Sequence, residues 1–415
     1  MKAKTILAVL LFILVIILTV SGCKYDVAEP LWDQPAATGV TSPTITGVIP
    51  KDSAGAGVNT ITIQGTNFSD SLSGNIVYIF NGTSSFTPTI LSSSNSAITI
   101  LRPNLVAGAG TISVVKNGAF DVAKFSPYKI TSVLQKYGSF LDNVSLSTIA
   151  VDSVDNLYVE ETSNFKIHKV TPNGDKAVLG YVPWNPVDMK VGPDGNLYFT
   201  TGSREVAQIN VKTGAATTRW RWLSQGRLVS TLEFANNNFV YFGGSTDLYI
   251  LNLATAASSS GITTPVVSGL YPASDGNTII AMHTYKGYLY LAVRNDQAQT
   301  QIIYKHQINA DGTLGTQQTV LNWTTTQFSS FTLKNFALSA DLSTIYVQTN
   351  DAVENLFVVN SQGIASFYKG ILPAYGVFSS WSSGSTYLYM ITGNTAPAAD
   401  WNVYRVDMGS KSAPR

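Results

Sequence analysis

Short runs of alternating apolar and polar residues, separated by turns rich in Gly, Asn and Asp, extend from about residue 43 to residue 411. In Thr60–Ile63 the two kinds of side chain alternate one for one, which is typical of a strand with one buried face. Similar runs occur at 76–80, 97–100 and 111–115. Short strands at close spacing with polar turns predict a β-sandwich in this first region and an all-β chain.

The first region also opens with a recognisable motif. Pro43–Pro50 leads through Gly55 and Gly57 to Asn59–Phe68, which reads Asn-Thr-Ile-Thr-Ile-Gln-Gly-Thr-Asn-Phe. This motif resembles the start of an IPT/TIG domain, an immunoglobulin-like sandwich, and the resemblance covers residues 43–126. The resemblance implies a spacer or an interaction module, with a binding face of its own as the alternative.

The second region repeats one phrase, a polar turn followed by a strand that contains a tyrosine. An apolar strand follows each copy and another precedes it. The six repeat tyrosines are 40 to 56 residues apart, and they are Tyr158, Tyr198, Tyr241, Tyr290, Tyr346 and Tyr389. This period is close to that of four-stranded propeller blades. We therefore predict a six-bladed β-propeller over residues 128–411, with an eight-stranded jelly roll as the alternative that six phased copies disfavour.

The best-preserved copy, Asp194–Phe199, reads Asp-Gly-Asn-Leu-Tyr-Phe and resembles the NHL repeat. The last copy leaves no room for an outer strand after Asp407, whereas Lys129–Tyr137 reads as a strand without a blade. Pairing this strand with the last blade would close the ring and remove two free edges.

The N-terminus has a different pattern, with two lysines followed by the apolar run Thr5–Val20 and then Ser-Gly-Cys23. The run is shorter than the roughly 20 residues of a spanning helix. Residues 20–23 resemble a lipoprotein lipobox, which implies cleavage of residues 1–23 as a signal peptide and acylation of Cys23. An ordinary secretory signal with a chance cysteine is the alternative.

Residues 24–42 contain several Pro, Ala and Gly residues without a clear period, which predicts a flexible tether. Lys24 is not the Asp that retains many lipoproteins in an inner membrane. By resemblance to the lipoprotein sorting rule, we expect an outer-membrane lipid anchor on Cys23 and exposure at the cell surface, with the periplasmic face as the alternative.

Composition narrows the function classes further. Charged residues make up 12% of the chain, the net charge is +1 and no basic run occurs, so we expect no nucleic-acid partner. A single cysteine excludes an internal disulfide. Three scattered histidines without a Cys cluster give little basis for a zinc site, and we expect no cofactor.

In a propeller, the loops between the second and third strands and the links between blades share one face, and loops carry function. Planar aromatic rings beside charged and amide groups suit sugar recognition, because a ring stacks on C–H patches while polar groups bond hydroxyls. The face therefore predicts a site for a glycan or protein ligand, although polar loops and gap-filling tryptophans would look similar. The candidate residues are Trp184, Arg204, Glu205, Trp222, Arg227, Arg294, Asp296, Trp323, Asn350, Asp351, Asp400 and Trp401.

The competing hypothesis is an enzyme, because six-bladed propellers of the gluconolactonase type hold a divalent metal in the channel. No motif places such a ligand set here, and the loose candidates are Glu160, Asp188, Glu233 and Asn295. A lyase that uses a channel histidine would need one on a first strand, which leaves His283. A packed, hydrogen-bonded histidine is the alternative for that position. We therefore predict a non-catalytic binding module, with a metal-dependent lactonase or lyase as the alternative.

Overall fold

A computed structural model describes residues 39–141, 144–221, 228–235, 238–256, 266–351, 353–373, 375–381, 384–393 and 401–413. The expected signal peptide, Cys23 and most of the tether lie outside these residues. Within the described part, helical structure is limited to the short 3-10 turns Leu72–Gly74, Thr162–Asn164, Ala273–Asp275 and Trp323–Thr325. No helix of this part is long and apolar enough to cross a bilayer. The prediction of an all-β fold is confirmed.

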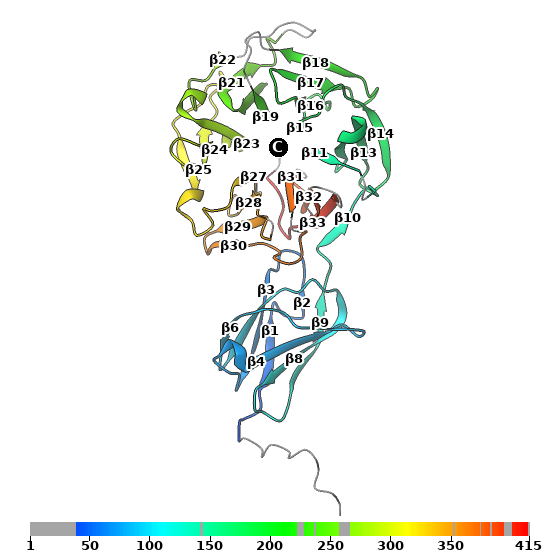
Figure 1. Ribbon diagram of the computed structural model, residues 1–415, viewed down its shortest axis with the longest axis vertical. Coiled ribbons are helices and arrows are strands. Elements are labelled where there is room, and N and C mark those ends of the chain that lie inside the picture. The colour runs from blue at the N-terminus through cyan, green and yellow to red at the C-terminus, as the bar shows by residue number, and fades with distance from the viewer. Residues whose placement is uncertain are drawn as a thin grey trace, which may run out of the picture.

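The N-terminal domain is a sandwich of two sheets, drawn in blue and cyan in Figure 1. One sheet has the order β1 (Thr44–Ile49), β3 (Thr60–Thr66), β7 (Ala97–Leu101), β6 (Ile90–Ser94). The other has the order β2 (Ser53–Ala54), β9 (Ala123–Ile130), β8 (Ala107–Lys116), β4 (Asn75–Phe80), β5 (Ser85–Phe86).

The alternation in the sequence matches the core of this sandwich. Ile61 and Ile63 of β3 face inward, as do Val77 of β4 and Ile112 of β8, and all four are wholly buried. The intervening threonines of β3 point outward. Burial of alternate apolar side chains from both sheets is what holds such a sandwich together.

The C-terminal domain is a ring of blades (Figure 1). The described residues form six four-stranded antiparallel sheets here. The first blade consists of β11 (Leu146–Val151), β12 (Leu157–Glu161), β13 (Lys166–Val170) and β14 (Lys176–Tyr181). The second consists of β15 (Asp188–Val191), β16 (Leu197–Thr200), β17 (Glu205–Ile209) and β18 (Ala216–Arg221). The third consists of β19 (Val229–Phe234), β20 (Phe239–Gly244), β21 (Thr246–Asn252) and β22 (Val266–Val267). The fourth blade consists of β23 (Asn277–Tyr285), β24 (Tyr288–Asn295), β25 (Thr300–Gln307) and β26 (Gln318–Asn322). The fifth consists of β27 (Leu333–Leu338), β28 (Ile345–Thr349), β29 (Leu356–Asn360) and β30 (Gly363–Ser366). The sixth consists of β31 (Tyr375–Trp381), β32 (Tyr387–Gly393) and β33 (Asn402–Asp407), together with β10 (Leu134–Lys136).

The structure explains why the repeat phrase recurs. Each repeat tyrosine lies in the second strand of its blade and is buried. In the second blade, the carboxylate of Asp194 accepts hydrogen bonds from the backbone and side-chain amides of Asn196 and, at 2.9 Å, from the Tyr198 hydroxyl. Asp152 accepts equivalent bonds from Asn156 and Tyr158 in the first blade. The phrase therefore encodes a turn that satisfies the polar end of a buried ring.

The predicted closure of the ring is confirmed, with a shorter strand than expected. Leu134–Lys136 pairs with β33, opposite Tyr404–Val406, and completes the last blade. The start of the expected segment, including Lys129 and Ile130, belongs instead to β9 of the sandwich. The propeller therefore begins after residue 130 rather than at 128, because β9 continues to Ile130 between β2 and β8 of the sandwich.

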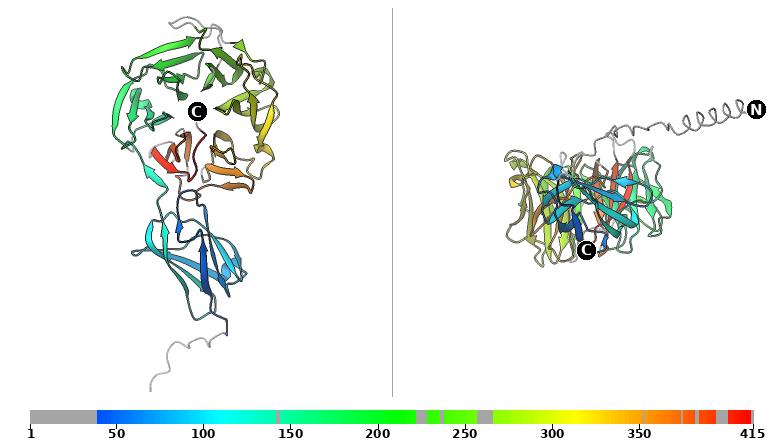
Figure 2. Two further views of the ribbon diagram at one scale, coloured as in Figure 1. Left: turned by 180° about the vertical axis from the view of Figure 1, so that it is seen from behind. Right: turned by 90° about the horizontal axis from the view of Figure 1, so that it is seen from below.

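The two domains meet at the rim of the ring, beside the last two blades (Figures 1 and 2). Asn59 of the sandwich accepts a hydrogen bond from the Tyr368 backbone amide at 2.8 Å and donates to the Ser366 carbonyl at 2.5 Å. The Tyr368 hydroxyl lies between the two domains, where it accepts from Gly57 and donates to the Asp407 carbonyl. The view from below in Figure 2 shows the sandwich within the thickness of the ring, so that it covers neither face.

Candidate functional site

The sequence-predicted ligand residues fall into groups with different surroundings. Trp222, Arg227 and Asp400 lie outside the described residues, as does Cys23. Trp184 lies in the link between β14 and β15 and is 36% exposed, so its ring is accessible to a ligand. Arg204 and Glu205 are half-buried at the start of β17.

The prediction for Trp323 is wrong. This residue follows β26, its side chain is wholly buried, and its indole N–H donates to the Phe331 carbonyl at 2.9 Å. The ring stacks with Phe328 and contacts the edge of Phe357. Trp323 fills the space between the fourth and fifth blades and presents no face to a ligand. Trp401 is half-buried, and it packs against the core cluster between the first and last blades.

Two other predicted residues stabilise local backbone. The Asn350 side-chain oxygen accepts from the Thr332 backbone amide at 2.8 Å. One carboxylate oxygen of Asp351 accepts from the backbone amides of Val353 and Glu354. The Asp351 bonds are typical of an Asx turn, whereas the Asn350 bond joins the end of β28 to the residue before β27. Both side chains therefore stabilise the backbone of the fifth blade.

A cavity of about 340 Å³ lies at the mouth of the central channel, at the end where the first strands of the blades begin. First strands of five blades line it, namely β11, β15, β19, β23 and β27. Their polar contributions include the half-buried hydroxyl residues Ser230 and Thr278. Thr148 and Thr231 also border the cavity, but both are buried. The accessible apolar lining comes from Val187 and Ile280, because the other apolar residues at the border, Ile149, Ile279, Ala281 and Leu333, are buried. The cavity therefore combines a hydrophobic wall with convergent polar groups, as small-molecule sites commonly do.

In the first charged cluster of the cavity, the charged residues bond one another. The Asp188 carboxylate lies 3.3 Å from the Lys190 ammonium. Its other oxygen accepts from the Thr231 hydroxyl and the Leu232 backbone amide, both at 3.0 Å. These contacts join the inner strands of the second and third blades. Both oxygens of the Asp188 carboxylate are therefore bonded within the protein.

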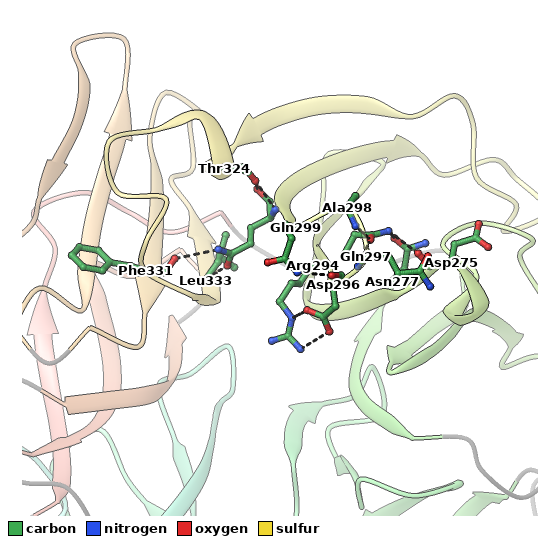
Figure 3. A network of polar contacts seen from close by, with 12 residues as sticks. Asp275, Asn277, Arg294, Asp296, Gln297, Ala298, Gln299, Thr324, Phe331 and Leu333 are labelled. Carbon is green, nitrogen blue, oxygen red and sulfur yellow. Dashed lines mark hydrogen bonds and ion pairs between the residues drawn. The ribbon is translucent and has the colours of Figure 1, made fainter.

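The second charged group comes from the fourth and fifth blades. Arg294, at the end of β24, lines the cavity and forms a 2.8 Å ion pair with Asp296 in the following turn. Figure 3 shows this pair beside the network of Asn277, Gln297 and neighbouring residues that fixes the turn. Lys334, the second residue of β27, also lines the cavity. Burial and the nearby Arg294 guanidinium both lower the pKa of the Lys334 ammonium.

The residues suggested for a channel metal do not form one site. Asp188 is held by Lys190 and Thr231, while Asn295 donates to the Asp275 carbonyl and to Asn277. Glu160 is buried and accepts from the Ser147 hydroxyl, and burial raises its pKa to about 7. Glu233 lines a different cavity. Among the described residues, no group of three or more His, Cys, Asp or Glu is placed to hold a metal ion. This donor set does not fit a divalent cation.

The opposite end of the channel has a cavity of about 460 Å³, lined by the first turns of three blades and by Glu233 and Trp381. The C-terminal segment runs beside this end, where Ala413 donates to the Leu338 carbonyl. His283 lies nearby in β23, and its ring hydrogen-bonds the Phe336 carbonyl at 2.6 Å and packs edge-on against the Phe336 ring. These contacts agree with a packed histidine.

Of the predicted ligand residues, only Arg294 lines the channel-mouth cavity among the described residues. Sequence reasoning missed Lys334, Lys190 and the threonines. A signal was present, because most of these residues begin the first strand of a blade, ten to twelve residues before the repeat tyrosine. In this position lie Thr148, Asp188, Thr231, Thr278 and Lys334. A polar residue recurring at the start of an inner strand would have indicated a channel lining.

Comparison with known families identifies the first domain. Residues 43–131 match the family model of the IPT/TIG domain. This segment is an IPT/TIG domain. The match extends past the expected end at residue 126, as β9 does. No curated protein sequence matches the chain.

Solved structures with a similar outline have few identical residues. An auxiliary nutrient binding protein from Bacteroides ovatus is 11% identical with a TM-score of 0.45, covering 88% of this chain and 98% of that chain. One from Bacteroides thetaiotaomicron is 11% identical with a TM-score of 0.49, covering 88% and 97%. A gluconolactonase from Xanthomonas campestris is 11% identical with a TM-score of 0.48, covering 66% and 89%. Neither a ligand nor an activity follows from likeness at this level.

Proposed function

We propose that this protein is a lipid-anchored, outer-membrane binding protein with an NHL-type propeller, and that the propeller binds a glycan at the loop face without chemical turnover. The observation that carries this proposal is the channel-mouth cavity, where first strands of five blades meet and hydroxyl, amide and charged side chains lie beside an apolar wall. Such a lining matches a sugar ring, which offers hydroxyl groups at its edge and C–H groups on its faces.

The arrangement of the domains supports the same proposal. The IPT/TIG domain is fastened to the rim by Asn59 and Tyr368, so it leaves the loop face open. With acylation at Cys23, residues 24–42 and the sandwich would hold the ring away from the bilayer. The enzyme alternative has no comparable support, because Asp188, Glu233 and Asn295 bond different partners, namely Thr231, Thr284 and the Asp275 carbonyl.

The proposal is tested on a glycan array with the chain from Lys24 onward. We expect retention of at least one polysaccharide class, and loss of that retention in Thr278→Tyr, whose ring would occupy the cavity. The matched control is Thr217→Tyr, an exposed position on the outer strand β18. If no glycan is retained and a protein is captured through the same face, the ligand class is wrong. Retention that Thr278→Tyr leaves unchanged would place the site elsewhere.

A further inference from the structure

The channel-mouth cavity is lined by more positive than negative charge. The described lining includes the cationic side chains of Lys190, Arg294 and Lys334 and a single carboxylate, Asp188. This imbalance is local, because the whole chain has a net charge of only +1. Charge concentrated in a recess acts strongly on a ligand, since surrounding protein screens it less than bulk water does.

The three cations differ in how they are compensated. Lys190 lies 3.3 Å from Asp188, and side-chain exposures of 10% and 20% place this pair largely out of the solvent. Arg294 pairs with Asp296, whose side chain is 61% exposed, so solvent screens that contact. Lys334 is half-buried, and no carboxylate among the described residues forms an ion pair with it. Among the described residues that line the cavity, Lys334 is therefore the cation without a carboxylate partner.

The position of Lys334 beside Arg294 strengthens this point. Two neighbouring cations repel one another, and this repulsion together with burial lowers the pKa of Lys334. An anion placed between them would interact favourably with both charges and remove the repulsion. Arg and Lys are also the side chains that carboxylates bind most strongly, through charge-assisted hydrogen bonds.

We propose that the cavity binds an acidic sugar residue, with its carboxylate group between Lys334 and Arg294. This inference rests on the proposed function and names the class of glycan. The hydroxyls of Ser230 and Thr278 would then form hydrogen bonds with the sugar hydroxyls, and the apolar lining would contact a face of the sugar ring. A volume of about 340 Å³ fits one sugar unit rather than a long chain segment, so the site would read an end or a branch.

The test is calorimetric titration of the chain from Lys24 onward with galacturonate oligosaccharides and with matched neutral galactose oligosaccharides. We expect the acidic ligand to bind and its affinity to fall as salt is raised, because ions screen the contact. Lys334→Met should weaken acidic-ligand binding about ten- to a hundredfold, the loss of a charge-assisted contact. Lys334→Arg, which keeps the charge, should retain most of the affinity. The control is Lys305→Met, which removes a lysine that lies over the Tyr288 ring in the fourth blade.

Each other outcome has a defined meaning. Equal binding of acidic and neutral oligosaccharides would overturn this inference and leave the proposed glycan-binding function standing. Acidic binding that is unchanged in Lys334→Met would overturn the assignment of Lys334. Inorganic phosphate that competes as well as a galacturonate oligosaccharide would show a general anion site and overturn the sugar assignment. If no sugar of either kind binds here or on the array, the proposed function itself is wrong.

Discussion

At the scale of single residues, burial separates a packing aromatic from a binding aromatic. Trp184 and Trp323 look alike in the sequence, since both follow an outer strand and precede the next blade. Trp184 is 36% exposed, whereas Trp323 is wholly buried with its N–H bonded to Phe331. The difference arises because Trp323 meets Phe328 and Phe357 across the gap between blades, and no aromatic neighbour of this kind is found around Trp184 among the described residues.

Replacing Trp323 with Ala should therefore destabilise the propeller by about 3–5 kcal/mol, the usual cost of emptying a buried aromatic site. Trp184→Ala is the matched control and should change the free energy of unfolding by about 0.5 kcal/mol or less. Urea unfolding of both variants measures the difference. Equal losses of stability in the two variants would contradict the distinction between them.

Glu160 gives the protein a dependence of stability on pH. Burial raises its pKa to about 7, although the Ser147 hydroxyl bonds the carboxylate and acts in the opposite direction. Because the folded state then holds a proton that the unfolded state has released, the free energy of unfolding should fall as pH rises from about 4.5 to about 7. Below about pH 4.5 the carboxyl group is protonated in both states, so the free energy of unfolding no longer changes with pH through this group.

Glu160→Gln removes this titration while keeping the shape and an acceptor oxygen for Ser147. We expect the variant to be more stable than the parent at about pH 8, and to lose less stability between about pH 5 and about pH 8. Urea midpoints at the two pH values provide the measurement. Parallel pH profiles in both proteins would show that Glu160 does not titrate in this range.

At the scale of elements, the ring depends on a strand that comes from the other end of the propeller sequence. β10 (Leu134–Lys136) pairs with β33, and flanking bonds from Tyr137 to Val403 and from Asp407 to Val133 continue the ladder. This pairing covers the edge that β33 would otherwise expose. The closure also joins the segment after the sandwich directly to the last blade.

Gln135 lies opposite Arg405 in this pairing, and a proline there cannot donate to the ladder. Gln135→Pro should lower the stability of the propeller by about 0.5–1.5 kcal/mol, as expected for the loss of one hydrogen bond of the ladder. Thermal unfolding and light scattering would follow the loss of stability and any association through the free edge. Gln135→Ala is the control, because it loses only the side-chain contact to Arg405 at 2.6 Å. A variant Gln135→Pro as stable as Gln135→Ala would show that β10 does not hold the ring closed.

At the scale of the whole molecule, the sandwich and the channel-mouth cavity occupy different sides of the ring. Asn59 and Tyr368 fix the sandwich beside the last two blades, on the side where the chain enters the ring. The cavity at the channel mouth lies on a face of the ring that the sandwich leaves free. A protein tethered at its N-terminus can thus present the cavity outward, as the proposed binding of an acidic glycan requires.

The sequence by itself determined much of this architecture, because the signals are local. Alternation at Thr60–Ile63 follows from the two faces of a strand, and the Asp194–Tyr198 phrase encodes a complete turn with its own hydrogen bonds. The repeat tyrosines then fix the number of blades, and the strand after the sandwich closes the last of them. Each of these features needs only neighbours in the chain or a period along it.

Only the tertiary structure decided which side chains meet. Asp188, Arg294 and Lys334 come from three blades far apart in the sequence, and the closed ring brings their strands to one channel. Sequence reasoning favoured loop tryptophans and turn residues such as Asp351, because their types suit a ligand equally well on any loop. Whether a side chain is buried between blades, bonded within its turn or directed into the channel depends on the neighbouring blade, which the local pattern does not contain.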